Sequence, residues 1–388
     1  MKNCPQAKAC FSSRQYGEEC GVFGIALKEG STLSAAHSVY TALYTLQHRG
    51  QQTAGIASVD KGTFHLHKGP GLVPDVFGDK NLKTLTGPAA IGHVRYASGG
   101  DTATINAQPL VVTHASGSMA VCYNGRLVNS DELRRETENR GGIFQSSNSA
   151  EVIAYLLVRE RMRAGTIEDA VINAMQYMVG AYSVVLLTQG KLVAFRDPNG
   201  FRPLCIGELP DGNGYAFASE SCALDAVGAT LLRDVKPGEI VVADAKTGEL
   251  RSITDHVGRP DTQMCVFEFI YFARPDSIIE GSSVHEARKQ AGRFLAQEHP
   301  VEADVVIGVP QQLDDAGRGG TAHDGVIHQH HALALDGARD HVQLDAHAVL
   351  TLLLAALNEE MCIRDRGYSL EARYSFRLIF SIVVLLYG

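Results

Sequence analysis

The stretch EECGVFGIALKEG, residues 18–30, decides how the chain begins to fold and carries one reactive side chain. Its apolar run predicts a strand over residues 20–27. Cys20 stands at the start of that strand, and the small Gly21 follows it directly. The nineteen residues before the cysteine are polar and show no apolar periodicity. A reactive side chain in this position raises the question of whether those residues are kept.

The composition limits the function classes. The chain has 388 residues, of which 45% are apolar, and this predicts two or three domains with ordinary buried cores. The net charge of −8 gives no electrostatic support for a nucleic-acid or anionic-membrane partner. The N-terminus lacks the apolar run of a secretory signal, so we expect a cytoplasmic protein.

The eight cysteines are scattered and form no CxxC pair, which argues against a disulfide framework or a zinc ribbon. They stand at positions 4, 10, 20, 122, 205, 222, 265 and 362.

Up to about residue 250, the sequence contains both short apolar runs, which predict strands, and stretches of helical periodicity, which predict helices. Turn residues between the runs indicate that most strands are joined by hairpins, which favours stacked sheets flanked by helices over a βαβ array. Beyond residues 20–27, strands are predicted over 89–97, 119–125, 181–189 and 191–197, and helices over 34–47, 149–162 and 167–179.

A second unit is predicted to open near residue 265. There CVFEFIYFARPDS precedes a helix expected over 284–298 and a buried strand, ADVVIGVP, over 303–310. This order of elements is typical of the beginning of an α/β domain.

The chain changes character after Pro310, which resembles a change of reading frame. Residues 311–347 hold six of the fifteen histidines, at spacings that fit no pair of metal ligands on a helix. The final apolar run, 378–388, is shorter than the roughly 17–25 residues of a membrane-spanning helix. The run MCIRDR resembles an artefact found at the ends of translated metagenomic fragments. We therefore interpret residues 311–388 as an anomalous tail that is not native.

Cys20 has two interpretations. A thiol with a pKa near 8.5 is mostly protonated at neutral pH and needs a base before it acts as a nucleophile. If the chain were cut between Glu19 and Cys20, the new α-amino group, with a pKa of about 7.7–8.0, could be that base. The alternative is a buried strand cysteine without chemistry.

Three further stretches offer polar groups, each with a structural alternative. Arg49 in LQHRGQQTAGIA either supports a site or is a surface charge at a helix C-terminus. Arg95 in IGHVRYAS either grips a carboxylate or lies on the surface. Asn124 and Gly125 in CYNGRLVN either form a hairpin turn or offer two N–H donors to an oxyanion.

Taken in order, these stretches resemble the class II glutamine amidotransferases, which are N-terminal-nucleophile hydrolases. Together with QHRGQQTAGI, four further motifs are similar to the glutamine phosphoribosylpyrophosphate amidotransferases, and the resemblance runs from about Cys20 to Pro310. The motifs are QHRGQQTAGI (47–56), RDPNGFRPL (196–204), FASES (217–221), RDVKPGE (233–239) and YFARPDS (271–277). The resemblance implies an α+β fold: a four-layer αββα sandwich, followed by an incomplete α/β phosphoribosyltransferase-type domain. It also implies a propeptide over 1–19, a glutaminase domain over 20–258 and the start of the transferase domain over 265–310.

The resemblance implies a role for each residue. Cys20 would attack the side-chain amide of glutamine, with its α-amino group as the base, and Asn124 with the N–H of Gly125 would form the oxyanion hole. Arg95 would bind the substrate α-carboxylate. Arg49 would support the pocket from behind, and Tyr96 would couple glutamine binding to the second site. Ammonia would then pass through a channel to phosphoribosyl pyrophosphate, giving 5-phosphoribosylamine.

One substrate-binding position departs from the family pattern. Where relatives of this kind carry an aspartate for the glutamine α-ammonium, the stretch SSNSAEVI (146–153) places Ser149. Serine keeps a hydrogen bond but loses the charge. Weak glutamine affinity is therefore expected, unless Glu151 or another acid takes over.

The phosphoribosyl-binding loop of the family, which would hold a phosphate at a helix N-terminus, is not found. LDDAGRGGTAH (313–323) is only a superficial echo of it. We therefore expect no phosphoribosyl transfer by this polypeptide and interpret the chain as retaining the glutaminase half.

The incomplete transferase domain also affects which cofactors the chain is expected to hold. The family pattern implies Mg²⁺ and, in some members, a 4Fe–4S cluster held by four cysteines. Cys265 resembles the first of those ligands, and Cys362 lies in the anomalous tail. We therefore expect no cofactor to be held by this chain alone.

Two alternatives to the purine enzyme stay open. One is another class II glutaminase, such as one that serves sugar-phosphate amination. The other is a non-catalytic relic that binds glutamine without turning it over. The expected partners are glutamine and, in the complete enzyme, phosphoribosyl pyrophosphate and further copies of the chain. Nucleic acid and membrane are not expected.

A negative charge at position 149, where the family pattern has an aspartate, should strengthen glutamine binding. Ser149→Asp is expected to lower the glutamine KM by about tenfold or more, because a charge-assisted contact contributes about 1.5–3 kcal/mol. Steady-state glutaminase assays measure this, and an unchanged KM would show that the ammonium site lies elsewhere.

Overall fold

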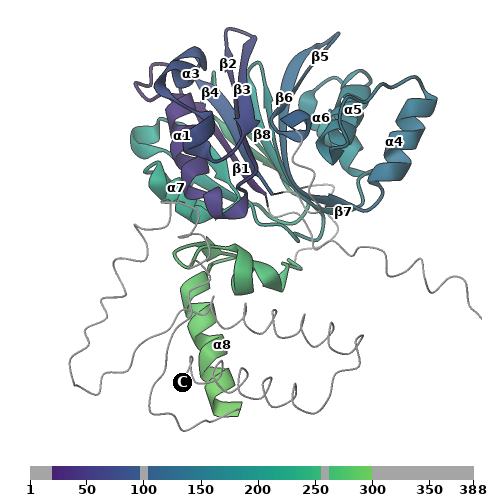
Figure 1. The fold of residues 1–388 in the computed structure, drawn as a ribbon. Helices are drawn as coiled ribbons and strands as arrows, with labels where there is room; N and C mark the ends of the chain where they lie inside the picture. The colour runs from purple at the N-terminus through teal and green to yellow at the C-terminus, as the bar shows by residue number, and fades with distance from the viewer. Residues whose placement is uncertain (1–19, 97–103, 255–261, 299–388) are drawn as a thin grey trace, which may run out of the picture. The chain divides into compact units, whose positions relative to one another are not determined.

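The structure is a computed structural model that describes residues 20–96, 104–254 and 262–298 (Figure 1). The chain divides into two compact units between Met264 and Cys265. The propeptide, the strand expected over 303–310 and the whole tail of 311–388 lie outside the described residues.

Two stacked antiparallel sheets form the first unit. The first sheet has seven strands in the order β11-β9-β10-β1-β4-β2-β3, and the second has six in the order β13-β12-β8-β7-β6-β5. The strands are β1 (Gly21–Leu27), β2 (Thr53–Asp60), β3 (Thr63–Pro70), β4 (Ala89–Arg95), β5 (Leu110–His114), β6 (Gly117–Leu127), β7 (Gly180–Thr188), β8 (Lys191–Arg196), β9 (Cys205–Glu208), β10 (Gly214–Ala218), β11 (Thr230–Asp234), β12 (Ile240–Asp244) and β13 (Leu250–Ile253).

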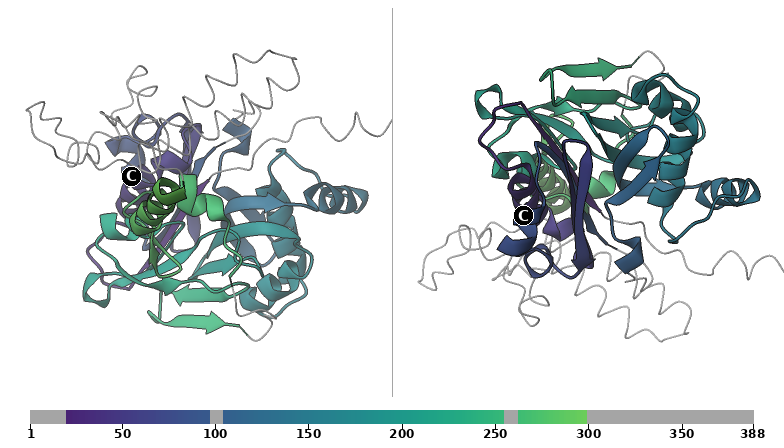
Figure 2. Two further views of the ribbon diagram at one scale, coloured as in Figure 1. Left: turned by 90° about the horizontal axis from the view of Figure 1, so that it is seen from below. Right: turned by 90° about the horizontal axis from the view of Figure 1, so that it is seen from above.

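Helices cover the outer face of each sheet, so the first unit has four layers (Figures 1 and 2). The first sheet carries α1 (Ala35–Thr45), α2 (Val73–Val76), α3 (Asp79–Thr84) and α7 (Ser221–Ala226), and the second carries α4 (Ser130–Asn139), α5 (Ser149–Arg161) and α6 (Ile167–Met175). Short helical turns occur at η1 (Gln47–Arg49), η2 (Thr104–Asn106) and η3 (Pro210–Gly212). Among the residues that the structure describes, no helix is long and apolar enough to cross a membrane.

The alternation of side chains along each strand produces three separate cores. On β1, Phe23 and Ile25 face α1, whereas Val22 and Ala26 face the second sheet. Successive strand residues point to opposite faces, so a strand between two covered faces is apolar on both. This is why the runs that predicted strands are nearly continuous.

Close packing requires glycine at Gly24 of β1. A Cβ built there would lie 2.6 Å from Val185 Cγ1 and 3.0 Å from Leu192 Cδ1, both on the facing sheet. A methyl group at that position cannot fit without moving the sheets apart. Glycine at position 24 of the first strand therefore permits the close contact between the two sheets.

The predicted strands and helices of the first unit are confirmed within a few residues at their ends. The hairpin-turn interpretation of Asn124 and Gly125 is wrong, because both residues lie inside β6. The turn signal misled because Gly125 has a φ of +139°, which glycine adopts within a strand as readily as at a turn.

The RDPNGFRPL motif forms a hydrogen-bonded corner after β8. The Asp197 carboxylate accepts from the N–H groups of Tyr182, Asn199 and Phe201, and burial raises the pKa of this carboxyl. The Arg196 guanidinium donates to the carbonyls of Gly200, Arg202 and Val235. The motif therefore satisfies buried main-chain groups at the end of the second sheet.

The described part of the second unit is a turn of π-helix, a small hairpin and one long helix. The elements are η4 (Glu268–Phe272), β14 (Ile278–Ile279), β15 (Ser282–Ser283) and α8 (Val284–Glu298). The helix predicted over 284–298 is confirmed. Arg288 of α8 donates to the carbonyls of Phe269 and Ala273, at 2.7 Å each, and so ties the helix to the preceding turn.

Candidate active site

Cys20 lies at the entry to β1, a central strand of the first sheet, and its side chain is buried. The register of β1 against β4 pairs Gly21 with Val94 and Val22 with His93. Continued by one residue, this register sets Cys20 opposite Arg95. Sheet geometry alone therefore brings together two of the residues predicted from separate motifs.

Asn124 comes from the facing sheet. On β6, Ala120 and Cys122 point into the core between the sheets, and the period of two sends Asn124 the same way. Its Oδ1 accepts a hydrogen bond from the main-chain N–H of Cys20 at 3.3 Å. Its Nδ2 is fully buried and has no hydrogen-bond acceptor within the described ranges. An amide donor beside the cysteine is thus left available.

Gly125 continues β6 in a conformation that excludes a side chain. A Cβ there would overlap the carbonyl oxygen of Ala181 and lie 2.8 Å from the Cα of Tyr182. With φ of +139° in addition, only glycine fits without strain. The two adjacent residues therefore offer a side-chain amide and an unhindered main-chain N–H.

Arg49 is buried, so the surface-charge interpretation is wrong. It follows α1 in the short turn η1, and its Nε donates to the carbonyl of Cys20 at 3.1 Å. Its Nη1 pairs with the carboxylate of Glu220, which is also buried. The guanidinium thus fixes the main chain of the cysteine, and the supporting role predicted for Arg49 in a substrate pocket stays a prediction.

Glu220 was not among the predicted site residues. It lies in the FASES motif directly after β10, and its Oε1 also meets Nε2 of His48 at 2.8 Å. The neighbouring Ser219 accepts from the N–H of Val22 through its hydroxyl at 2.9 Å. The only available signal was a glutamate within an otherwise small and apolar run.

Arg95 and Tyr96 end β4 beside the cysteine. Arg95 is buried at the end of the stripe of Ala89, Ile91 and His93, so its surface interpretation is also wrong. The Tyr96 side chain is 43% exposed, and its carbonyl oxygen lies 3.8 Å from the Cys20 Sγ. The roles predicted for these two side chains stay predictions.

Ser149 is the first residue of α5, and its hydroxyl lies 3.0 Å from that of Ser130. Glu151, the acid that could have replaced the missing charge, is occupied elsewhere. Its two oxygens accept from the N–H groups of Gln145 and Ser146 and from the Ser146 hydroxyl, at 2.7–2.9 Å. The carboxylate therefore holds the loop before α5.

Cys265 lies in the second unit, half-buried and without a disulfide. The other described cysteines are buried in the first unit, and the described residues contain no group of three or more His, Cys, Asp or Glu side chains that could hold a metal. An iron–sulfur cluster needs four thiolates, which these residues do not provide. The histidines of 311–347 lie outside the described residues.

His93 is fully buried between the sheets. Burial, together with the positive charges of Arg95 and Lys68, lowers its pKa to about 3. The ring is therefore neutral at physiological pH. Burial also raises the pKa of the Cys122 and Cys205 thiols well above their ordinary value, which leaves these two cysteines unreactive.

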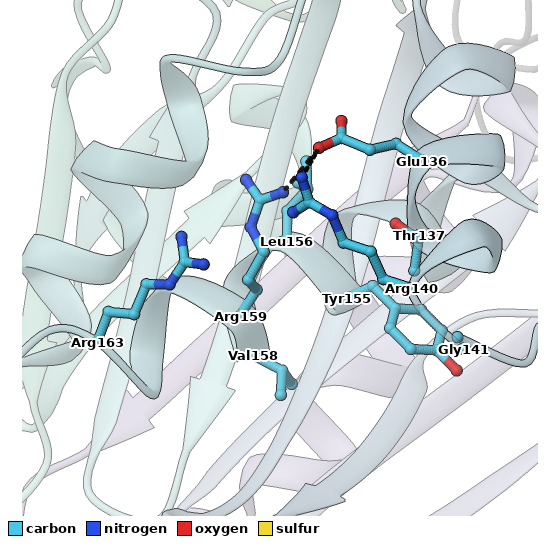
Figure 3. A pocket seen from close by; sticks show the side chains of 10 residues that line it. Glu136, Thr137, Arg140, Gly141, Tyr155, Leu156, Val158, Arg159 and Arg163 are labelled. Carbon is cyan, nitrogen blue, oxygen red and sulfur yellow. Dashed lines mark ion pairs between the residues drawn. The ribbon is translucent and has the colours of Figure 1, made fainter.

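A surface pocket of about 410 Å³ lies between α4 and α5 (Figure 3). None of the predicted site residues lines it. Each guanidinium in the lining has a carboxylate within 4 Å: Arg140 meets Glu136, and Arg159 and Arg163 meet Glu160. Because each of these guanidinium groups already has a carboxylate partner, no anion site is assigned there.

Removing the buried carboxylate should destabilise the fold. Glu220→Gln leaves the Arg49 guanidinium charged and without that partner, so the free energy of unfolding should fall by about 3–5 kcal/mol. Urea denaturation measures the change. The control is Glu136→Gln, which removes an exposed ion pair and should cost at most about 1 kcal/mol. Equal effects would contradict the argument.

His93 should make stability fall with acid. The unfolded chain protonates this ring near pH 6.5, whereas the folded chain does so only near 3. Its contribution is therefore fully present above pH 6.5 and is lost as the pH falls from 6.5 toward 3. Between pH 7 and 5, His93→Gln should reduce the fall in unfolding free energy by about 2 kcal/mol. Identical falls measured by urea denaturation would contradict this.

Comparison with known proteins identifies related sequences. Residues 93–226 match the family model described as a glutamine amidotransferase domain. The chain is 45% identical over 305 residues to the amidophosphoribosyltransferase of Methanocaldococcus jannaschii, covering 75% of this chain and 64% of that protein. For the Bacillus subtilis amidophosphoribosyltransferase, the identity is 42% over 313 residues, covering 80% and 63%.

A solved structure shows the same fold. The B. subtilis glutamine phosphoribosylpyrophosphate amidotransferase in complex with ADP and GMP superposes with a TM-score of 0.68 and 44% identity, covering 75% of this chain and 61% of that one. The chain thus spans less than two thirds of the length of these relatives. The α+β, N-terminal-nucleophile hydrolase prediction is confirmed. Over the part that these comparisons cover, the chain is similar in sequence and fold to amidophosphoribosyltransferases, and residues 93–226 match the glutamine amidotransferase domain.

Proposed function

We propose that this chain hydrolyses glutamine at Cys20 and, as part of an amidophosphoribosyltransferase of purine synthesis, supplies ammonia to phosphoribosyl pyrophosphate. The observation that carries the proposal is the approach of Asn124 from the facing sheet, with Oδ1 on the Cys20 N–H and a buried, available Nδ2. A buried amide donor without an acceptor is costly unless a ligand supplies one.

The chemistry needs a free amine at Cys20. After cleavage of the bond between Glu19 and Cys20, the α-amino group would stand where the peptide N–H now meets Asn124 Oδ1. That carbonyl would orient the amine, which accepts the thiol proton as Sγ bonds to the amide carbon of glutamine. The Arg49 contact on the Cys20 carbonyl holds the same residue from its other end.

The oxyanion formed by this attack would be stabilised by Asn124 Nδ2 and the N–H of Gly125. Preorganised donors of this kind each contribute about 2.7–4 kcal/mol to the transition state. As the carbon–nitrogen bond breaks, ammonia leaves with the proton from the α-amino group. Water then attacks the thioester, giving glutamate and restoring the thiol.

The substrate would be held by groups at the ends of the strands. Arg95, buried opposite Cys20, would pair with the α-carboxylate, and Tyr96 would signal binding to the second site. Ser149 would face the α-ammonium with a hydroxyl only. The transfer to phosphoribosyl pyrophosphate, the Mg²⁺ that the family pattern implies and the oligomer rest on the resemblance alone, and the cytoplasmic location rests on the N-terminal sequence.

A non-catalytic relative is the second candidate. The observation that favours it is the pairing of Ser149 with Ser130, together with the commitment of Glu151 to its loop, which leaves no carboxylate at that position for the ammonium. A glutaminase that serves sugar-phosphate amination has less support, because the relatives described above are amidophosphoribosyltransferases.

The thiol of Cys20 should be the group that reacts. Purified protein is expected to begin at Cys20, to release ammonia from glutamine and to be labelled once by diazo-oxo-norleucine. Cys20→Ala should abolish labelling and lower turnover at least 1,000-fold, about 4 kcal/mol of barrier. Intact mass and an ammonia assay measure both.

The matched control is Cys205→Ala, a buried thiol outside the site, which should keep label and turnover. Retention of residues 1–19 with full turnover, or turnover by Cys20→Ala, would overturn the mechanism. An unprocessed and unlabelled chain that still binds glutamine would identify the relic.

A further inference from the structure

The main chain of Tyr123, the residue before Asn124, is hydrogen-bonded by a side chain at a place where a neighbouring strand would be expected. The pairing of β5 with β6 runs from His114–Gly117 to Leu110–Val121 and then stops. Where the next main-chain hydrogen bonds of this pairing would fall, the Gln108 side chain takes the place of the partner strand's main chain. Its Oε1 accepts from the Tyr123 N–H at 2.7 Å, and its Nε2 donates to the Tyr123 carbonyl at 3.3 Å.

His93 supplies a third bond to the main chain of the same residue. Its Nε2 lies 3.1 Å from the Tyr123 carbonyl oxygen. A carbonyl can only accept, so the ring must carry its proton on Nε2. His93 and Gln108 are both buried, so water does not compete for these bonds. The neutral ring described above is the form that suits this arrangement.

The segment that carries Gln108 is itself anchored. Lys68 on β3 donates to the carbonyl of Ala107 at 2.6 Å, and burial lowers the pKa of this lysine. The neighbouring Pro109 leads directly into β5. Gln108 is thus fixed on both sides, and its amide is presented to β6 in one orientation.

On its other side, β6 pairs with β7 along Met119–Leu127. Tyr182 stands opposite Gly125, but its N–H and C=O bond to Asp197 on the far side. Main-chain groups alternate in direction along a strand, so the Gly125 N–H points to the same edge as that of Tyr123. That edge lies beyond the end of β5, and Gln108 and His93 are the side chains that fix its orientation.

We infer that Gln108 and His93 are positioning residues that set the Asn124 amide and the Gly125 N–H in register for the oxyanion. The inference rests on the proposed function. Neither residue touches substrate in this account, because both act through the main chain of Tyr123. Their effect should therefore fall on the chemical step and spare the binding of glutamine through Arg95.

The first test replaces the clamp by an apolar side chain of similar length. Gln108→Met is expected to lower kcat 10- to 100-fold per site that diazo-oxo-norleucine can label, with KM changed less than threefold. The control Gln189→Met removes a surface glutamine whose amide donates to the Gly62 carbonyl. A merely structural role would reduce the number of labelled sites and leave kcat per site unchanged, and that result would overturn the inference.

The second test uses two variants of the histidine. His93→Gln keeps a nitrogen donor for the Tyr123 carbonyl, whereas His93→Leu keeps only bulk. The glutamine variant should retain at least tenfold more kcat per labelled site than the leucine variant. Equal losses in both would show that the bond to Tyr123 is not what matters.

Hydrogen exchange provides a readout that needs no turnover. In Gln108→Met, peptides that cover 119–127 should exchange faster by at least tenfold, while Gln189→Met should match the parent protein. Unchanged exchange in this segment overturns the inference. If the parent protein exchanges as expected but hydrolyses no glutamine, the proposed function fails and the clamp on Tyr123 stands as a structural device.

Discussion

Every second side chain of β1, β4 and β6 points into the space between two stacked sheets, and the site lies where these inward rows end. Val22 of β1, Ile91 of β4 and Cys122 of β6 belong to the same buried layer. Toward the strand ends, apolar residues give way to Cys20 and Asn124 at the next inward position, and on β4 to His93 and then Arg95. The proposed site is therefore an extension of the core pattern, with polar groups placed at its margin.

That margin is costly to build, because it removes charged groups from water. Arg49 and Glu220 compensate each other's burial, and the guanidinium uses a second N–H on the Cys20 carbonyl. A buried pair of this kind adds little stability over apolar residues but penalises any arrangement that separates the partners. In this chain it joins the end of α1, the end of β10 and the start of β1, three segments that are distant in sequence.

The sequence predicted the strands and helices of the first unit well, because residues with both faces covered form long apolar runs. It predicted that Cys20, Arg49, Arg95 and Asn124 would carry chemistry only through the family resemblance. Burial decides between a functional and a surface arginine, and burial depends on strand register, which no local pattern gives. Glu220, Gln108 and His93 escaped notice for the same reason: each acts through a main-chain group far away in sequence. The hairpin-turn interpretation of Gly125 failed because a positive φ is equally compatible with a turn and with an irregular strand.

The strand that follows Cys20 also bears on the proposed cleavage before that residue. The rungs of β1 begin at Gly21, paired with Val94, and run inward to Leu27. Cleavage of the bond before Cys20 would break none of these described β1 pairings, so the two sheets need not separate for it to occur. The proposed cleavage would turn the amide nitrogen of Cys20 into an amine in a domain that has already folded. Folding and activation would then be separate steps.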